Sequence, residues 1–438
     1  MRLPGLATPA ACLMLAILAL HATLLPEAHW RGDEFICSAF ARDGHLAYLW
    51  RQRIGGWSPR PLSESVFYVY CRLAAALQRP LTIPFIAMLW IALFASTLAS
   101  MRTTAPPRLL AGLATCCMFL LGHPVGEMFY WPAGAVAYVS TLAAASLAVF
   151  LLIDDRGRCW SGTLALSATL AACAACSEAG ACLTVLLAPA LAALRWRHPG
   201  RALALSLPGL GVVGFVFWEV AGHRVGSAEA VGHLTVWQSL RPVPSDLWRE
   251  ARHLWPARLA FLLGMRWCTA RTRPKAGALM ACAVVLPLAA AAVAAASWHQ
   301  FGALCCERHE SLRQCWMVLA LAAAGSASVR LWTVGDRTAA FGPGMLMLAC
   351  LIGIVPRLQP ILHDIRLMDT ITMIRREDWR GGRAPTASMQ YYLPPVAMVA
   401  GPDGIPTGHF TEPALESWSA HGMMLFFHKH RITILPPA

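Results

Sequence analysis

The sequence predicts an all-α polytopic membrane protein with about 11 transmembrane helices. Of its 438 residues, 57% are hydrophobic and only 13% are charged, whereas soluble domains carry about 25% charged residues. Apolar runs of roughly 20 residues recur along most of the chain, and this length matches the thickness of a bilayer core. Basic residues stand beside most of these runs, as is typical of helices that end at lipid headgroups.

Hydropathy and length define the predicted spans. The fifth and sixth are short and are separated only by Ser177 and Glu178, and the eighth is weak enough to fit an interfacial helix instead. The first resembles a signal peptide, but no small-x-small cleavage site follows it, so we expect it to be retained. The predicted spans are 5–25, 82–101, 107–122, 134–153, 161–176, 179–194, 202–221, 254–268, 277–298, 315–332 and 338–356.

Basic residues in the short loops predict the orientation of the chain. One set of short loops contains arginine or lysine and the other contains neither, so the basic set and the N-terminus are expected to be cytoplasmic. An odd number of spans then places the first long loop and the C-terminal tail on the opposite face. The basic residues in question are Arg102, Arg108, Arg156, Arg158, Arg195, Arg197, Arg201, Arg271, Arg273, Lys275 and Arg337.

The net charge of +13 comes almost entirely from arginine, since Lys275 and Lys429 are the only lysines. Arginines that flank spans meet lipid phosphates, and this accounts for the basic balance. No basic face of a soluble domain remains. We therefore expect membrane lipids among the partners of this chain, and no nucleic acid.

The first outer loop, 26–80, is too long to be a simple connector. Leu62 and Ser63 fit the start of a helix. Apolar residues then recur at helical spacing, which predicts an amphipathic helix lying in the membrane interface. These apolar residues are Val66, Tyr70, Leu73 and Leu77.

The tail has few apolar runs long enough to cross a membrane. We expect a helix near 358–378 and short strands at 396–400 and 432–435, which together form a small α/β extracytoplasmic tail. The predicted organisation is therefore a transmembrane domain at 1–356, which includes the 26–80 loop, followed by the tail at 357–438.

Most of the 15 cysteines lie inside apolar runs, where cysteine behaves as a small hydrophobic residue. Cys37, Cys71, Cys305 and Cys306 instead fall in predicted outer loops, where disulfides are stable. The sequence leaves their pairing open. It also gives the remaining cysteines no zinc-site spacing with a histidine.

Two adjacent carboxylates, Asp33 and Glu34, follow the first span. Neighbouring residues point about 100° apart on a helix and to opposite faces of a strand. The two acids are therefore expected to do different jobs. One is a candidate general base, while the other binds a cation or holds an arginine. Ordinary solvated loop acids are the simpler alternative.

The segment 122–138 joins an acid to a group of aromatic residues. Tyr130, Gly134 and Tyr138 share one face at four-residue spacing if the segment is helical, with Trp131 beside them and Glu127 just before. Such a group suits stacking and hydrogen bonding of a sugar. An interfacial aromatic belt is the alternative explanation.

Two further charged positions accompany this face. Glu178 stands between two apolar halves with almost no loop, and an ionisable group near membrane depth is a functional candidate. Arg308 and Arg313 lie in the segment CCERHESLRQC, where the planar guanidinium of either one suits two phosphate oxygens at once. A wet turn and a self-paired surface loop are the respective alternatives.

The chain has no P-loop, no G-x-G-x-x-G after a strand and no H-E-x-x-H. These absences disfavour an ATP-driven pump and a soluble nucleotide-sugar enzyme. Chemistry on the outer face therefore needs a donor that is already there, which favours a lipid-linked substrate.

The layout resembles the GT-C superfamily of multi-span glycosyltransferases, whose members carry paired acids in a long first outer loop. The stretches RGDEFICSAFARDGHLAYLWRQRIGGWSPR, EMFYWPAGAVAY, SEAG and ESWSAHGMMLFFHKHRITIL carry the resemblance. They look most like a little-studied bacterial membrane family allied to that superfamily, and the serotype-modifying Gtr-type glucosyltransferases are similar in layout. Many relatives have two aspartates and an aromatic residue where this chain reads GDEF.

The resemblance implies a bacterial inner-membrane enzyme whose active site and tail face the periplasm. It would transfer a sugar from a polyprenyl-phosphate donor to a glycan, lipid or protein acceptor. Asp33 or Glu34 would be the catalytic base or would hold a divalent cation, Mg²⁺ or Mn²⁺. The implied substrate-binding residues are Arg60, Glu127, Tyr130, Trp131, Tyr138, Glu178 and Arg308.

Two other classes of function remain open at this point. A transporter or flippase for a lipid-linked saccharide explains Glu178 and the outer arginines equally well, although its site is expected near the bilayer midplane, and no internal repeat is evident. A non-catalytic assembly protein would tolerate replacement of Asp33, Glu34 and Glu127.

Overall fold

The structure of the chain is a computed structural model. It describes the residues in eight ranges: 6–99, 106–153, 159–223, 234–270, 276–329, 341–399, 405–414 and 416–437. Several of the basic residues used above to predict orientation lie outside the described residues, namely Arg102, Arg156, Arg158, Arg271, Arg273, Lys275 and Arg337. The orientation therefore stays a prediction.

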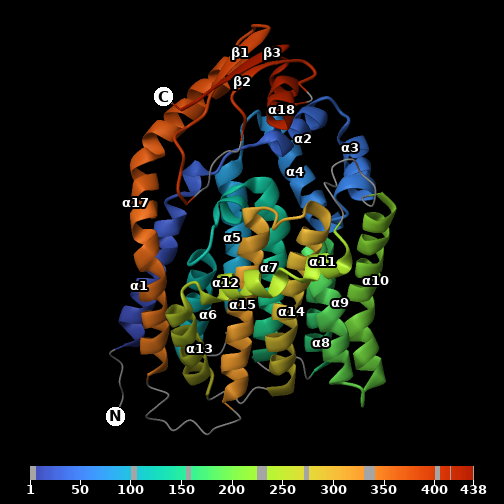
Figure 1. Cartoon of the computed structure of the whole chain (residues 1–438), viewed down its shortest axis with the longest axis vertical. Coiled ribbons are helices and arrows are strands. Elements are labelled where there is room, and N and C mark those ends of the chain that lie inside the picture. The colour runs from blue at the N-terminus through green and yellow to red at the C-terminus, as the bar shows by residue number, and fades with distance from the viewer. Residues whose placement is uncertain are drawn as a thin grey trace.

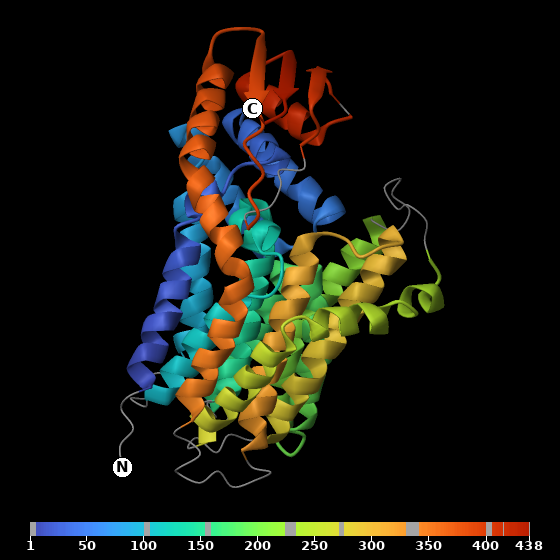
Figure 2. The ribbon, with the colours of Figure 1, turned by 60° about the vertical axis from the view of Figure 1, so that its left-hand side comes forward.

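The described chain is a bundle of helices crowned at one end by a smaller cap (Figure 1). The bundle helices are α1 (Ala7–Ala22), α5 (Thr82–Ala99), α6 (Pro106–Leu120), α7 (Pro132–Ile153), α8 (Trp160–Cys176), α9 (Glu178–Ala193), α10 (Pro199–His223), α13 (Trp255–Thr269), α14 (Ala276–Phe301), α15 (Glu307–Ser328) and α17 (Gly342–Arg383). Two short helices, α11 (Val236–Leu240) and α12 (Val243–Arg252), lie across the side of α14 (Figure 2).

Five helical segments are long and apolar enough to cross a membrane: Ala7–Glu27, Pro132–Ile153, Pro199–Gly222, Ala276–Phe301 and Gly342–Arg383. Thr82–Leu98, Pro107–Leu120, Trp160–Cys176 and Glu178–Ala193 are shorter apolar helices. This composition supports a helical membrane protein. The number of spans stays a prediction, and α13, at the weak eighth position, has only 15 residues, whereas a span needs about 20.

Helix α7 is the centre of the bundle. In its apolar window, 83% of the residues are buried, and α7 contacts α4, α5, α8, α14 and α15. Small residues let its neighbours approach closely, since a Cβ built on Gly180 of α9 would lie 1.9 Å from the carbonyl oxygen of Cys173. The end of α8 is thereby packed closely against the start of α9.

The segment between α1 and α5 folds over one end of the bundle. It contains η1 (Leu25–Glu27), α2 (Gly32–Arg42), α3 (Leu46–Gln52), the π-helical turn η2 (Arg53–Trp57) and α4 (Pro61–Leu77). A second π-helical turn, η3 (Gly126–Tyr130), precedes α7. Such turns are rare and occur often at functional sites.

The helix predicted to begin near Leu62 is confirmed as α4. The apolar residues predicted to form one face of it do not share a face. Tyr70 is buried, with Phe67 and Ala74, against the rest of the protein, whereas Leu73 and Leu77 are exposed. The helix is thus packed on α2 and α7 along one side and presents apolar residues outward along the other.

Helix α17 runs without a break for 42 residues, about 63 Å at 1.5 Å per residue. The last predicted span and the predicted helix 358–378 are therefore one element, and the boundary at 356 falls inside it. Pro356 and Pro360 lie within the helix. Figure 2 shows α17 continuing from the bundle to the cap.

The cap contains β1 (Ser388–Tyr392), β2 (Gly408–Thr411), α18 (Trp418–Phe427) and β3 (Arg431–Leu435). The sheet order is β1-β3-β2, with β1 parallel and β2 antiparallel to the central strand. The predicted strand at 432–435 matches β3. The one predicted at 396–400 is wrong over its described part, 396–399, which has no strand, because backbone N–H groups there bond to the Asp364 carboxylate instead.

Helix α18 packs across α2 and fixes the cap to the first loop. The indole ring of Trp418 lies directly over Gly32, where a Cβ atom would come within 2.5 Å of the ring. At the other end of α2, the Arg42 guanidinium donates to the carbonyl oxygens of Leu425 and Phe426 at the end of α18. The absence of a side chain at Gly32 is therefore a condition for docking.

Gly32→Ala tests this docking. We expect overpacking to cost about 1–3 kcal/mol of stability, seen as a lower thermal unfolding temperature in detergent and faster proteolysis of the tail. Gly214→Ala is the control, because a Cβ at Gly214 meets nothing within 4 Å. Equal unfolding temperatures for Gly32→Ala and the wild type would contradict the packing described here.

Candidate functional site

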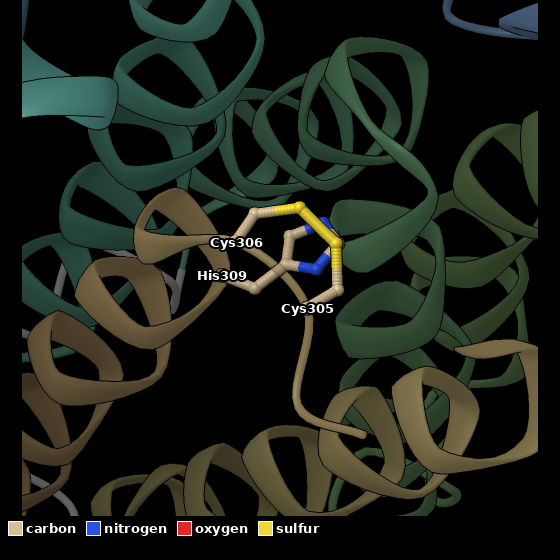
Figure 3. A group of neighbouring side chains, drawn as sticks. All are labelled: Cys305, Cys306 and His309. Carbon is tan, nitrogen blue, oxygen red and sulfur yellow. A yellow bond between two sulfur atoms is a disulfide. The ribbon is translucent and has the colours of Figure 1, made fainter. Parts of the chain in front are cut away.

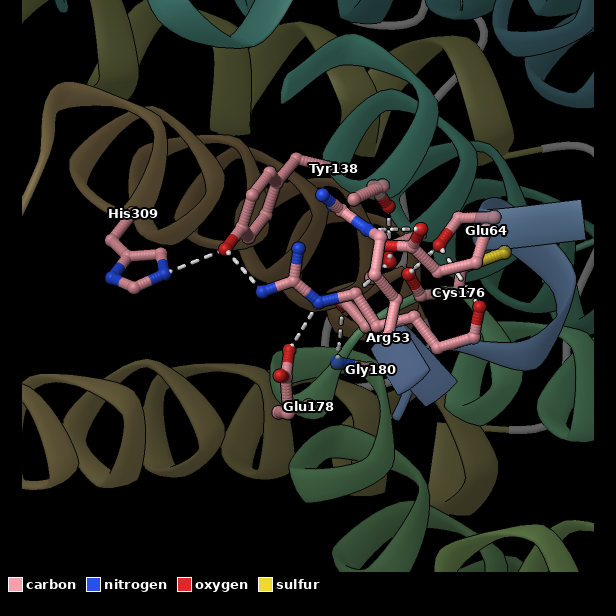
Figure 4. Close-up of polar contacts among 12 residues, drawn as sticks. Arg53, Glu64, Tyr138, Cys176, Glu178, Gly180 and His309 are labelled. Atoms are coloured by element: carbon pink, nitrogen blue, oxygen red, sulfur yellow. Dashed lines mark hydrogen bonds and ion pairs between the residues drawn. The ribbon is translucent and has the colours of Figure 1, made fainter. Parts of the chain in front are cut away.

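The candidate site is a cluster of acids and arginines between the bundle and the cap. It is built from the starts of α2, α4, α7, α9 and α15 and from the turns η2 and η3. Figure 4 shows part of this cluster, in which Tyr138 points toward His309. Helix ends and π-helical turns carry the polar groups here, while the middles of the bundle helices remain apolar.

Glu34 occupies the buried centre of this region and is fully inaccessible. Its Oε2 atom accepts hydrogen bonds from the backbone N–H of Arg31 at 2.8 Å and from the indole N–H of Trp131 at 3.2 Å. Its Oε1 atom accepts the backbone N–H of Ala133 at 2.9 Å. Glu34 therefore caps the first turn of α2 and ties it to the start of α7.

Burial and the neighbouring Asp33 charge raise the pKa of Glu34 to about 7, against the opposing effect of its three N–H donors. Desolvation disfavours the ionised carboxylate, and a nearby like charge does the same. This carboxyl thus titrates near neutral pH.

Asp33 faces a different direction from Glu34 and is partly exposed. Its Oδ1 atom accepts a hydrogen bond from Arg53 Nη1 at 2.9 Å, and the Nε atom of the same guanidinium bonds Glu64 Oε2 at 2.9 Å. No described residue donates a hydrogen bond to the Oδ2 atom of Asp33. One carboxylate oxygen is held by an arginine, and the other is available.

A second chain of polar contacts begins at Arg60, the residue before α4. Its Nε atom bonds Glu178 Oε2 at 2.6 Å, and its guanidinium lies 5.5 Å from the centre of the Tyr138 ring. The Tyr138 hydroxyl is 3.5 Å from Arg60 Nη2 and 2.7 Å from His309 Nε2. Four helix ends are joined in this way.

His309 is a neutral partner in this chain. Burial and the charges of Arg308 and Arg60 lower its pKa to about 3, so its imidazole is uncharged near neutral pH. The ring therefore has one N–H and one lone pair, and its contact with Tyr138 depends on which nitrogen carries the proton.

Trp131 lies between two arginines. The Arg31 guanidinium is 5.0 Å from the centre of its ring, and that of Arg308 is 5.2 Å away. The same two arginines approach Glu127, with N···O distances of 3.5 Å and 3.6 Å. Glu127 and the Trp131 ring thus hold the Arg31 and Arg308 guanidinium groups close together. The Arg308 side chain is partly exposed.

Of the predicted site residues, Tyr130 points elsewhere. Its hydroxyl donates to the carbonyl oxygen of His21 at 3.0 Å, and it is buried beside Trp90 in the bundle. The spacing from Tyr130 to Tyr138 assumes one continuous helix. However, Trp131 is extended and α7 begins only at Pro132, so the two tyrosines do not share a face.

The sequence reasoning gave no role to Arg31, Arg53, Glu64 or His309, which complete the cluster. Arg31 and Arg53 lie in the long first loop, where the orientation rule ignores arginines, and Glu64 has no neighbouring motif. His309 was visible in the segment CCERHESLRQC as a neighbour of Arg308. Arg313 in that segment is fully buried and paired with Glu250.

The described residues contain one group of metal-ligand type with suitable spacing: Cys305, Cys306 and His309 (Figure 3). The two sulfur atoms are joined in a disulfide, so they are not thiolates that would bind an ion. The other two cysteines that were predicted in outer loops, Cys37 and Cys71, are free and buried.

The expected Mg²⁺ or Mn²⁺ site at Asp33 and Glu34 does not fit the donor set. Both Glu34 oxygens already accept N–H groups, and Asp33 is paired with a guanidinium. The two carboxylates do not converge on one position, and a divalent cation prefers several oxygen ligands around it. Arginine is therefore the cation that this arrangement provides.

The raised pKa of Glu34 predicts a change of stability with pH. A carboxyl whose pKa is higher in the folded state contributes stability fully below its unfolded value and loses it as the pH rises through the folded value. That window runs from 4.5 to about 7. We expect thermal stability in detergent to fall across it, by on the order of 3 kcal/mol from this group.

Glu34→Gln does not ionise and should lose this part of the decline, although its amide is also a poorer acceptor. Glu377→Gln, at an exposed acid of α17, is the control and should keep the wild-type dependence on pH. Parallel pH curves for Glu34→Gln and the wild type would contradict the assignment to Glu34.

Comparisons of this chain with protein-family models, with curated proteins and with solved structures give no match in any of the three. The site contains a partly exposed carboxylate, Asp33, which is paired with Arg53. Two further guanidinium groups, of Arg60 and Arg308, and the Trp131 ring belong to the same cluster at one end of the apolar bundle.

Proposed function

We propose that this protein is a membrane glycosyltransferase that moves a sugar from a polyprenyl-phosphate carrier to a glycan, lipid or protein acceptor. The observation that carries the proposal is one linked set of contacts. Asp33 pairs with Arg53, and its neighbour Glu34 bonds Trp131, over which Arg308 lies. Arg60 pairs with Glu178 and reaches His309, next to Arg308, through Tyr138. These residues come from five separate parts of the chain. A base, phosphate-binding cations and an aromatic ring are the groups that such a transfer requires.

Asp33 is the proposed general base. Its Oδ2 atom is available, and Arg53 fixes the carboxylate through Oδ1 at 2.9 Å. In the transfer, the acceptor oxygen bonds to the anomeric carbon while its proton passes to Asp33. The bond from the anomeric carbon to the phosphate oxygen breaks, and its electron pair stays on the phosphate. General base catalysis of this kind contributes about 10²–10⁴-fold.

Arg60 and Arg308 are the proposed partners of the departing phosphate. Both side chains are partly exposed, at 19% and 27%, so each has N–H groups to offer beyond its carboxylate partner. The guanidinium fork matches two phosphate oxygens, and a fixed cation stabilises negative charge that develops in the transition state. Glu178 and Glu127 hold the two arginines in place.

Trp131, Tyr138 and Glu127 form the proposed sugar-binding wall. Trp131 is 7% exposed and Tyr138 is 2% exposed, so the two rings are the buried back of this wall, where Glu34 and His309 fix them. Glu127 is 22% exposed and is the hydrogen-bond acceptor in this group. Glu34 has a positioning role here, because its contacts set the distance between the base on α2 and the wall on α7.

The proposed setting is the bacterial cytoplasmic membrane with the cluster on the extracytoplasmic face. The apolar helices support the membrane part of this statement. A lipid-linked donor suits a site at the end of such helices, because the isoprenoid chain stays in the bilayer while its phosphate and sugar reach the arginines.

Asp33→Asn tests the base. In membranes supplied with labelled polyprenyl-phosphate sugars, we expect transfer to fall about 10²–10⁴-fold while expression stays normal. Asp43→Asn is the matched control, because Asp43 lies at the other end of α2 and is an exposed acid paired with Arg42. Full activity in Asp33→Asn would overturn the proposed base.

A different result would change the class of function. If the wild type transfers no sugar, but reconstituted vesicles move a lipid-linked saccharide across the bilayer, the protein is a transporter. Asp33 and the arginines would then be contacts of its translocation route.

Arg60→Lys tests phosphate recognition. Lysine keeps the positive charge but lacks the planar fork, so we expect kcat/KM for the donor to fall by at least about tenfold, which equals ~1.4 kcal/mol. Arg51→Lys is the control, since Arg51 is exposed on α3. Unchanged kinetics in Arg60→Lys would exclude a bidentate contact at this position.

A further inference from the structure

A second charged site lies on the cap side of α17 and is separate from the acid–arginine cluster. It is a pocket of about 550 Å³ between the end of α17, the segment 28–30 and the connection from α4 to α5. None of the cluster residues described above lines it. The pocket is therefore distinct from the acid–arginine cluster.

Five arginines line the pocket: Arg79, Arg375, Arg376, Arg380 and Arg383. They face a single lining acid, Asp378, which is 4% exposed and accepts the backbone N–H of Tyr392 through Oδ1. The charge of the lining is therefore strongly positive. Such a surface attracts an anion.

Arg79 and Arg376 are the arginines most able to bind a ligand. Both are exposed, and neither side chain has a hydrogen bond or ion pair with any residue in the described ranges. Arg375 is committed to the backbone carbonyls of Pro26 and Glu27, and Arg383 donates to the carbonyl of Gln78. The Arg79 and Arg376 side chains can therefore turn toward a phosphate without breaking an existing contact.

The remaining wall is aromatic. Trp30, Phe35, Trp379 and Phe427 line the pocket together with Thr82. Trp379 packs against Trp30 at 5.4 Å and supports the Arg383 guanidinium at 5.6 Å. Cations set among indole rings are typical of the zone where a lipid headgroup meets its acyl chains.

Exposed apolar side chains flank the pocket residues Arg79 and Thr82 along the chain. Leu73 and Leu77 precede Arg79 on α4 and are 52% and 58% exposed, and Ile83 and Met88 follow Thr82 on α5 at 46% and 50%. A soluble anion would leave these apolar side chains exposed to solvent. The hydrocarbon chain of a lipid would cover it while the phosphate enters the pocket.

We propose that this pocket binds the phosphate of a membrane lipid, with Arg79 and Arg376 as its ligands and the exposed face of α4 and α5 as the bed of its chain. The proposal does not depend on sugar transfer. Two sources share the chemistry, an anionic glycerophospholipid and a polyprenyl phosphate, and the experiment distinguishes them.

The test measures the thermal unfolding temperature of delipidated protein in detergent with added phosphatidylglycerol, phosphatidylcholine, undecaprenyl phosphate or inorganic phosphate. We expect an anionic lipid to raise the temperature by several degrees, because a ligand that binds only the folded state stabilises it. Native mass spectrometry of the wild type counts the lipid molecules retained, so the test does not rely on a variant alone.

The double variant Arg79→Gln/Arg376→Gln should lose most of this rise. Arg72→Gln/Arg366→Gln is the matched control, because it removes the same charge from exposed positions of α4 and α17 that do not line the pocket. The better of the two anionic lipids identifies the source. Equal shifts with phosphatidylcholine or inorganic phosphate, or an undiminished shift in Arg79→Gln/Arg376→Gln, would overturn the proposal.

Discussion

The arrangement of the candidate site depends on the buried carboxylate of Glu34. Three N–H groups from two separate segments converge on it: one from the turn before α2 and two from the start of α7. A carboxylate buried without such donors would be very unfavourable. The requirement to satisfy it therefore fixes the first loop against the bundle and leaves the neighbouring Asp33 paired with Arg53. This single constraint explains why Glu34 is buried among N–H donors while the adjacent Asp33 is partly exposed beside Arg53.

Around this anchor, charge is distributed as short alternating contacts. Asp33, Arg53 and Glu64 form one group, and Arg60, Glu178 and Tyr138 form another. Each arginine is held by a carboxylate yet remains partly accessible. Such pairs add little stability at a surface, but they orient guanidinium groups before any ligand arrives. The cluster is in this sense organised for recognition, and the apolar bundle below it provides the rigid support.

Much of this arrangement follows from sequence-level reasoning, and the exceptions have physical causes. Hydropathy located the bundle helices, and the predicted topology placed Asp33, Glu127 and Glu178 at one end. Periodicity failed at Tyr130, because a π-helical turn and an extended Trp131 interrupt the helix. Hydropathy set a span boundary at 356, and this position falls inside a helix that continues through two prolines. Arg53 and Glu64 had no signal, since their pairing exists only once the loop has folded back.

The uninterrupted helix α17 has a mechanical consequence. It connects the apolar bundle to the cap as one rod, and a rod of this kind transmits tilt from one end to the other. Proline removes a backbone hydrogen bond and weakens the helix locally, so the softest point of the rod lies at Pro356 and Pro360. Any swing of the cap therefore pivots at these prolines. The sheet and α18 move with the end of α17, while Glu34 holds the start of α2 on the bundle.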